Sequence, residues 1–264
     1  MSKSIVIGVD VGGTFTDTLA LDEATGAVRV EKVPSTKGDQ SNGFLSGILA
    51  ATDHDLSSVS TIIHGTTVAT NALLERKGAK AGIITSEGFR DVLEMRRRDR
   101  PSTWGLWGQF TPVIERKCCL EVPERTLANG TVVKDVDEAS IKAAAQELIA
   151  QGCDSVCLFF INGYANTDNE IKAARILRQV WPNDYVSVAT EILPEIREFE
   201  RCSTASLNAY LQPVVANYLA RLETRIAEDE AGSEILIVQS NGGIMSVDTA
   251  KALPVRAALS GPAA

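Results

Sequence analysis

Three short apolar stretches, at 4–11, 16–22 and 27–33, open the chain and are separated by turn-forming segments. The first connection contains two consecutive glycines, and the second, Asp22-Glu23-Ala24-Thr25-Gly26, ends in one. Connections this short join antiparallel strands in hairpins. The pattern therefore predicts a mixed sheet that opens with three antiparallel strands.

Beyond residue 40, stretches that favour helices alternate with stretches that favour strands. We expect helices at 41–53, 67–77, 87–94, 137–151, 168–180 and 203–228, and strands at 60–64, 80–85, 154–161, 185–189 and 234–239. Thr66 or Thr67 is placed to cap the second of these helices, and Gly78 to end it. Alternation of this kind after three hairpin strands indicates an α/β fold.

Residues 96–136 interrupt the alternation. They contain three prolines and three large aromatic residues, namely Pro101, Pro112, Pro123, Trp104, Trp107 and Phe110. We interpret this part as an irregular insertion with a hairpin at 124–134 around Asn129-Gly130. The expected organisation is a first domain over 1–200 that carries the insertion, and a second, incomplete domain over 201–264 that begins with the long helix.

The composition restricts the class of protein. The chain has 264 residues, of which 44% are hydrophobic, and its 34 acidic and 26 basic residues give a net charge of −8. An acidic chain is a poor partner for nucleic acid or an anionic membrane, and no apolar run approaches the ~20 residues of a membrane span. The amino terminus passes directly into a strand, so no signal peptide is expected.

The cysteines favour a reducing compartment. Five occur, an odd number at low density, at Cys118, Cys119, Cys153, Cys157 and Cys202. Neither a disulfide scaffold nor a zinc site fits their spacing. We expect buried thiols and a cytoplasmic protein.

The most informative segment is Asp10-Val11-Gly12-Gly13-Thr14-Phe15-Thr16-Asp17. A strand carries Asp10 to the edge of a sheet, where a carboxylate can position a hydrated Mg²⁺ or a water molecule. Gly12 and Gly13 let the backbone approach a ligand, and exposed N–H groups with the hydroxyls of Thr14 and Thr16 can hold phosphate oxygens. The alternative is an ordinary hairpin with a Gly-Gly turn, in which Asp17 pins the strands.

A second candidate is His64-Gly65-Thr66-Thr67, where a strand ends and a helix begins. Helix N-termini attract anions, so a substrate carboxylate or a phosphoryl group is one possible occupant. Asn71 follows Thr67 by one helical turn and is expected on the same side. The alternative is a helix cap beside a histidine that is satisfied within the core.

Four further segments contain candidate residues, and three of them have two interpretations. Arg96-Arg97-Arg98-Asp99-Arg100 is either an anion clamp or, as we favour, a solvated loop. Trp104 and Trp107 either line a pocket or form an interface or local core. The charged residues around 197–201 are expected to form salt bridges. Ser240-Asn241-Gly242-Gly243 either faces a ligand cleft from the second domain or forms a plain turn.

The first loop resembles the first phosphate loop of the actin-like ATPase superfamily, in which the nucleotide lies between two related domains. Further segments narrow the resemblance to the A subunit of the hydantoinase/oxoprolinase family (N-methylhydantoinase A-like), over about residue 4 to the end. They are 64–76, His-Gly-Thr-Thr-Val-Ala-Thr-Asn-Ala-Leu-Leu-Glu-Arg; the weaker 101–108; 201–211; 239–245, Gln-Ser-Asn-Gly-Gly-Ile-Met; and 259–264, Leu-Ser-Gly-Pro-Ala-Ala.

This resemblance implies the ribonuclease H-like half of an actin-like ATPase fold. Members of the family continue beyond the Ser-Gly-Pro-Ala segment into a second Asp-x-Gly-Gly-Thr loop, which is missing from these 264 residues. We therefore expect a chain truncated before the second phosphate loop and without the adenosine pocket. Such a fragment is expected to bind Mg-ATP weakly and to be inactive by itself.

The resemblance also implies an activity. Members open cyclic amides such as hydantoins, 5-oxoproline and other lactams in an ATP-dependent hydrolysis, and an A subunit works with a B-type partner subunit. Carried onto this sequence, the catalytic residues are Asp10 and His64, with Asp10 also on Mg²⁺; Gly12, Gly13, Thr14, Thr16 and Asp17 hold ATP; and Thr66, Thr67 and Asn71 contact substrate. Relatives that carboxylate ketones, a small-metabolite kinase of the same superfamily, and a non-catalytic regulatory module remain alternatives.

Overall fold

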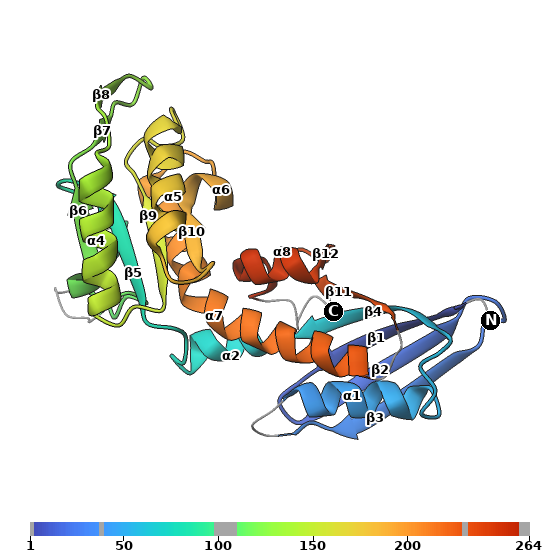
Figure 1. Cartoon of the computed structure of the whole chain (residues 1–264). Helices are drawn as coiled ribbons and strands as arrows, with labels where there is room; N and C mark the ends of the chain where they lie inside the picture. Colours follow the sequence, from blue (N-terminus) through green and yellow to red (C-terminus); the bar gives the residue numbers. More distant parts are fainter. Residues whose placement is uncertain (1–2, 37–39, 98–109, 229–231, 259–264) are drawn as a thin grey trace, which may run out of the picture. The chain divides into compact units, whose positions relative to one another are not determined.

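The computed structural model describes residues 3–36, 40–97, 110–228 and 232–258. They form an α/β fold with two compact units, Met1–Lys77 with Val214–Ala264, and Gly78–Pro213 (Figure 1). The 31-residue helix α7, Glu198–Glu228, contributes its first part to the second unit and its last part to the first. Among the described residues, no helix is long and apolar enough to cross a membrane.

The first unit is built on a six-stranded mixed sheet in the order β12-β11-β4-β1-β2-β3. Its strands are β1 Ile5–Val11, β2 Phe15–Asp22, β3 Val28–Pro34, β4 Val59–Thr66, β11 Glu234–Val238 and β12 Ile244–Ser246. β1 pairs antiparallel with β2, and β2 with β3, which confirms the predicted opening. β1, β4 and β11 run parallel to one another, so their carboxyl ends lie at one edge.

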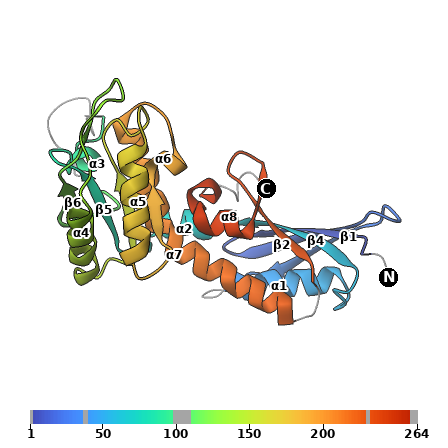
Figure 2. The same ribbon diagram turned by 45° about the horizontal axis from the view of Figure 1, so that its top comes forward.

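Helices cover one face of this sheet. α1, Gln40–Ala51, and the last part of α7 lie next to each other against the strands (Figures 1 and 2). Two glycines of α1 permit close packing, because a Cβ atom at Gly43 or Gly47 would lie 2.9 Å from the Thr16 hydroxyl or 2.4 Å from that of Thr18. Shorter helical elements complete the unit: α2 Val68–Leu74, α8 Val247–Ala252 and the 3₁₀ turn η2 Pro254–Ala257.

The second unit contains a four-stranded parallel sheet in the order β10-β9-β5-β6. Its strands are β5 Ala81–Ser86, β6 Cys119–Val122, β9 Ser155–Phe159 and β10 Val186–Val188. α4, Glu138–Ala150, and α5, Asp168–Val180, pack on each other beside it (Figure 1). The hairpin β7 Arg125–Thr126 and β8 Val132–Lys134, the helices α3 Val92–Met95 and α6 Ala189–Ile192, and the turn η1 Arg116–Cys118 complete it.

A buried ion pair joins the start of α7 to the first turn of α5, beside the carboxyl end of β9. The side chains of Arg201 and Glu170 are both fully buried, with 3.3 Å between Nη2 of Arg201 and Oε1 of Glu170. Arg201 also donates to the carbonyl of Phe160 at 3.1 Å and to Glu198 at 2.9 Å. Glu170 in turn accepts from the backbone N–H groups of Phe160 and Thr190. The predicted salt bridging in this region is confirmed, but its burial was not foreseen.

A proline interrupts the hydrogen bonding of α7. Pro213 lies inside the helix and has no N–H to donate to the carbonyl of Ala209, four residues earlier. The hydroxyl of Ser155, the first residue of β9, donates to that carbonyl at 2.6 Å. The acceptor that the proline leaves unused is therefore satisfied by a side chain of the sheet.

Several predicted boundaries are wrong. The helix expected at 67–77 ends at Leu74, because Arg76 takes the left-handed conformation with φ of 55°, and Gly78 instead makes room for the ring of Tyr210. The long helix begins at Glu198 rather than 203. The short helix expected at 87–94 comprises only Val92–Met95.

The insertion expected over 96–136 is irregular only in part. The hairpin around Asn129-Gly130 is present, with Gly130 at a φ of 83°. However, Cys119–Val122 forms β6, the edge strand that pairs with β5. This strand has four residues, of which only Cys119 and Val122 are buried, and is too short to give a clear pattern. Trp104 and Trp107 lie outside the described residues.

The expected domains over 1–200 and 201–264 remain a prediction, and the two compact units do not follow one another along the chain. In the structure, β11 and β12 join the sheet that contains β1, and residues 78–213 form a unit inserted between α2 and the last part of α7. The sequence gives no signal for this arrangement, because the pairing of β11 with β4 joins residues far apart in the chain.

Candidate functional site

Three of the sequence motifs come together where the parallel strands β1, β4 and β11 of the first sheet end. In the parallel register, Asp10 of β1 lies opposite Gly65 of β4, and His64 of β4 lies opposite Ile237 of β11. The loops that follow these strands therefore start side by side. They contain Gly12-Gly13-Thr14, Thr66-Thr67, and Ser240-Asn241-Gly242-Gly243.

The glycine loop between β1 and β2 is tight on one side and open on the other. The N–H of Gly12 donates to the carbonyl of Phe15 at 3.0 Å, which closes the turn. A Cβ atom at Gly12 would meet that carbonyl at 3.0 Å, whereas a Cβ atom at Gly13 would meet nothing within 4 Å. Among the described residues, no hydrogen bond takes up the N–H groups of Gly13 and Thr14. Free N–H groups beside open space suit an anion.

Asp10, the last residue but one of β1, carries an oxygen without a partner. Its Oδ1 atom is buried and accepts no hydrogen bond from the described residues. Burial raises the pKa of this carboxyl, and the negative charge of Asp17, its cross-strand neighbour, raises it further. A cation in front of Asp10 would satisfy the oxygen and reverse both effects.

The donor set fits magnesium better than a metal held by protein alone. No group of three or more His, Cys, Asp or Glu side chains suited to a metal occurs among the described residues. Mg²⁺ commonly uses one or two carboxylates and takes its other ligands from water and phosphate. Asp10 satisfies the protein's part of that requirement.

Thr16 and Asp17 point in opposite directions from β2. The side chain of Thr16 is buried towards α1, with its hydroxyl 3.0 Å from that of Ser35. Asp17 lies on the other face and accepts a hydrogen bond from Lys32 at 2.8 Å. Asp17 therefore pins β2 to β3, and Thr16 lies on the core side of the sheet, away from Asp10.

A cavity of about 550 Å³ lies on the face of the sheet that carries Asp10 and Asp17. The glycines Gly8, Gly65 and Gly242 border it, together with the apolar side chains of Leu19, Val30, Ile63, Val238 and Ile244. All of these residues belong to the first unit. Asp10 and Asp17 are the acidic side chains that line it, so its polar end lies at the carboxyl end of β1.

His64 lies in the core rather than on a ligand surface. Its side chain is fully buried and contacts the ring of Phe44, with 4.7 Å between the ring centres. Nδ1 lies 3.3 Å from the carbonyl oxygen of Val9, and Nε2 lies 2.8 Å from the hydroxyl of Tyr218. Burial lowers the pKa of the imidazole to about 4. These contacts fit the alternative of a satisfied core histidine.

Thr66, Thr67 and Asn71 form a local network at the start of α2. Thr67 occupies the N-cap position, but its hydroxyl donates to the carbonyl of Val11 at 3.2 Å instead of capping the helix. The side-chain amide of Asn71 donates to the Thr67 hydroxyl at 3.3 Å, which confirms that the two share a side. The Thr66 hydroxyl accepts from the N–H of Val68 at 3.2 Å. This network ties α2 to the end of β1.

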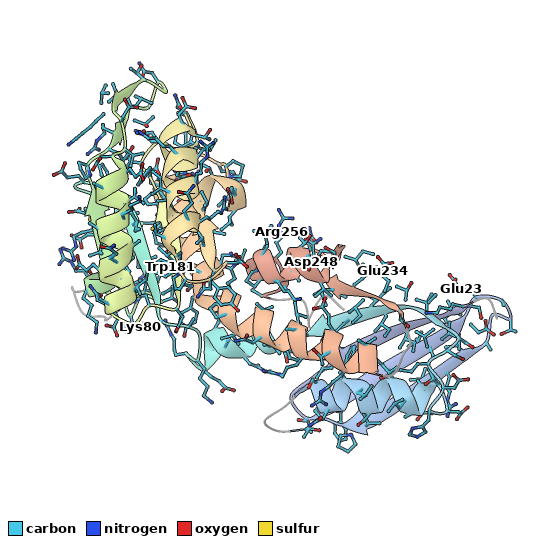
Figure 3. The ribbon with its side chains drawn as sticks, in the orientation of Figure 1. Glu23, Lys80, Trp181, Glu234, Asp248 and Arg256 are labelled. Carbon is cyan, nitrogen blue, oxygen red and sulfur yellow. The ribbon has the colours of Figure 1, made fainter. Side chains whose placement is uncertain are left out.

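The Ser240 segment forms a well-anchored turn between β11 and β12. Gly242 has a left-handed φ of 83°, and its N–H donates to the carbonyl of Gln239 at 3.0 Å. The backbone N–H and the hydroxyl of Ser240 both donate to the carbonyl of Arg256, a residue of η2 that Figure 3 labels. The turn belongs to the first unit, in the same sheet as the glycine loop, and its contacts fit the alternative of a plain turn.

The basic run contributes local contacts where it is described. Arg97 forms an ion pair with Glu200 at 2.5 Å, and Arg96 lies over the ring of Phe110 at 4.5 Å. Arg98, Asp99 and Arg100 lie outside the described residues. The residue that sequence reasoning missed is Tyr218, whose contact with His64 spans 154 positions and leaves no local signal.

Comparison with known proteins identifies the family. Residues 6–181 match the model of the hydantoinase/oxoprolinase N-terminal region, and residues 201–264 match the hydantoinase/oxoprolinase model. Similar proteins include an uncharacterized protein of Methanocaldococcus jannaschii (34% identical over 98% of this chain), the caprolactamase subunit alpha of Pseudomonas jessenii (32% over 97%) and the acetophenone carboxylase gamma subunit of Aromatoleum aromaticum (29% over 98%). This chain spans 38% of the length of each.

A solved structure agrees with the sequence matches. The crystal structure of the ATP-dependent caprolactamase from Pseudomonas jessenii superposes with a TM-score of 0.86 and 31% identity, over 98% of this chain and 39% of that one. The chain belongs to the hydantoinase/oxoprolinase family.

Proposed function

We propose that this chain forms the first phosphate-binding half of an ATP-dependent enzyme that hydrolyses cyclic amides. The observation that carries the proposal is the pairing of Asp10, whose buried Oδ1 lacks a partner, with a glycine loop that is open at Gly13. An orphan carboxylate oxygen and free N–H groups at one sheet edge suit Mg²⁺ and phosphate together. The match to ATP-dependent caprolactamase supports the same reaction class.

ATP would bind as the resemblance to actin-like ATPases implies, with its phosphates at the glycine loop. The N–H groups of Gly13 and Thr14 would hold the phosphate oxygens, and Gly12 would support them by closing the turn through its own hydrogen bond to the Phe15 carbonyl. Asp10 would hold Mg²⁺ directly or through water. When bound, ATP supplies a phosphoryl group that activates the amide carbonyl, which is otherwise a poor electrophile. Asp17 keeps β2 in place through Lys32, and the negative charge of Asp17 increases the demand of Asp10 for a cation.

The name of one relative supports a proposal for the partner, and the cysteines support one for the compartment. A relative named as a subunit alpha indicates a multi-subunit enzyme, and we propose a hydantoinase B-type partner subunit for this chain. All five cysteines are free, buried thiols, which supports the cytoplasm as its compartment.

A ketone carboxylase is the second candidate. It is favoured by the 29% identity with the acetophenone carboxylase gamma subunit. Phosphoryl transfer to a carbonyl oxygen would activate an amide or a ketone, so the glycine loop and Asp10 would serve either reaction. The two candidates differ in substrate and in the need for bicarbonate.

Phosphate release by the complete gene product, co-expressed with its partner subunit, tests the proposal. Hydantoins, 5-oxoproline, caprolactam and simple ketones form the panel. Release stimulated by one cyclic amide, with an equal amount of ring-opened product, supports the hydrolase. Stimulation by a ketone only in the presence of bicarbonate would replace it with the carboxylase, and no stimulation would overturn both.

The variant Asp10→Asn tests in that assay whether the Asp10 carboxylate takes part in the reaction. We expect turnover to fall by roughly 100-fold or more, the range seen when an electrostatic contact to a developing charge is removed. Asp22→Asn, at the other end of the same strand pair, is the matched control, because Asp22 only caps the turn to β3. Equal turnover of the two variants would remove Asp10 from the mechanism.

A further inference from the structure

We propose that His64 and Tyr218 form a positioning pair that fixes the orientation of the Val9–Asp10 peptide and thereby aims the Asp10 carboxylate. The inference rests on the proposed function for its catalytic consequence, but its structural part can be tested independently. It assigns a role to Tyr218, and it makes His64 a positioning residue rather than a group that touches substrate.

The first step of the argument is the place of the histidine contact. His64 lies opposite Val9 in the parallel register, and its Nδ1 reaches the Val9 carbonyl oxygen. That carbonyl belongs to the peptide that links Val9 to Asp10. Any rotation of this peptide changes the direction of the Asp10 side chain, which projects from the opposite face of the sheet.

The second step is the direction of the hydrogen bonds. A carbonyl oxygen only accepts, so Nδ1 must carry the proton that is donated to Val9. In a neutral ring, Nε2 is then an acceptor, and the hydroxyl of Tyr218 donates a hydrogen bond to it. The chain of donors therefore runs from Tyr218 through His64 to the Val9 carbonyl, and the tyrosine selects the tautomer that can hold the peptide.

The third step is the rigidity of the ring. His64 is fully buried, Tyr218 is 2% exposed, and Phe44 contacts the imidazole edge-on at an interplanar angle of 65°. Elements β1, α1 and α7 therefore hold the ring from three directions. With no accessible surface, the imidazole cannot reach a ligand, whereas its hold on the peptide beside Asp10 is direct.

Nitrogen NMR of this chain tests the structural part without any assay of activity. Only two histidines occur, and His54→Asn, which suits the left-handed φ of 64° at that position, assigns the spectrum. We expect His64 to be neutral with its proton on Nδ1, the tautomer that is less common in free histidine. In Tyr218→Phe, we expect a shift of the Nε2 resonance and of the Asp10 backbone amide. A proton on Nε2, or an unmoved Asp10 amide, overturns the proposal.

Kinetics of the complete gene product test the consequence for catalysis. Tyr218→Phe should lower kcat for substrate-stimulated phosphate release by roughly three- to tenfold, as expected for one lost hydrogen bond, with KM for ATP nearly unchanged. The control is Tyr210→Phe on the same helix, because that ring packs on Gly78 in the second unit. Equal kcat for the two variants refutes the positioning role. If the parent enzyme shows no such release, the proposed function fails, and the NMR result still decides the positioning pair.

Discussion

Replacing Arg201 with methionine should destabilise the second unit by about 3–4 kcal/mol at neutral pH. Arg201 and Glu170 both have 0% exposed side chains, and the substitution leaves Glu170 as a buried carboxylate without its cation. Removal of one partner from a buried ion pair typically costs about 3–5 kcal/mol. The lower part of this range applies, because Glu170 keeps two backbone N–H donors, from Phe160 and Thr190.

The cost should also depend on pH in a defined direction. Burial already raises the pKa of Glu170, and Arg201 is the largest of the groups that lower it. Without Arg201, the pKa rises further, so the folded variant binds a proton that the unfolded chain releases. The lost stability therefore grows as the pH rises above the ordinary glutamate pKa of 4.5. The variant should be closest to the parent chain at acid pH.

Urea unfolding followed by tryptophan fluorescence measures this effect. Trp181 lies in the second unit with only 5% of its surface exposed, so the change in its emission reports the unfolding of that unit. The control is Arg178→Met, because Arg178 pairs with Glu191 at 2.6 Å with about half of each side chain exposed. That pair should contribute less than about 1 kcal/mol. Equal losses for the two variants, or no dependence on pH, would contradict the buried pair.

Two further predictions concern the first unit. Gly13→Ala should leave the thermal midpoint of the isolated chain unchanged or slightly higher, because its Cβ atom meets nothing, while Gly12→Ala should lower it, because its Cβ atom meets the Phe15 carbonyl at 3.0 Å. If Gly13→Ala nevertheless abolishes ATP hydrolysis in the complete enzyme, a phosphate lies over Gly13; normal hydrolysis would place it elsewhere. Asp10→Asn should raise the thermal midpoint at pH 7, because the folded-state pKa of Asp10 is raised above 3.8 and ionisation therefore reduces stability as the pH rises. The gain should vanish below pH 3.8, and calorimetry at pH 7 and at the acid limit checks it; a gain that is independent of pH would point to another cause.

The sequence predicts the local features of the candidate site well. Consecutive glycines after an apolar run define the turn at Gly12 and Gly13, and a strand before it places Asp10 at the sheet edge. The alternation of side chains between the two faces of β2 gives a further prediction, which the phosphate-loop motif does not contain. Thr16 and Asp17 are adjacent, so they must lie on opposite faces, and only one of them can share the face of Asp10.

Features that depend on distant contacts could not be predicted. The role of His64 depends on Tyr218, and the burial of Arg201 depends on Glu170, 31 positions earlier. A histidine after a β-branched run and an arginine in a charged segment look the same whether they face solvent or the core. The membership of β11 in the first sheet has the same origin, because the pairing partner of a strand is not encoded in the strand alone.

The proline in α7 has a consequence for how the chain can vary. Because Pro213 leaves the Ala209 carbonyl free and Ser155 occupies it, positions 155 and 213 form a compensating pair. Loss of the hydroxyl alone leaves a buried acceptor unpaired, and loss of the proline alone restores an N–H that competes for the same oxygen. When Pro213 is replaced by a residue with an N–H and Ser155 by a residue without a hydroxyl, the Ala209 carbonyl accepts an ordinary helical hydrogen bond again. In a set of homologous sequences, the two positions should therefore change as a unit, although they lie in different elements of the second unit.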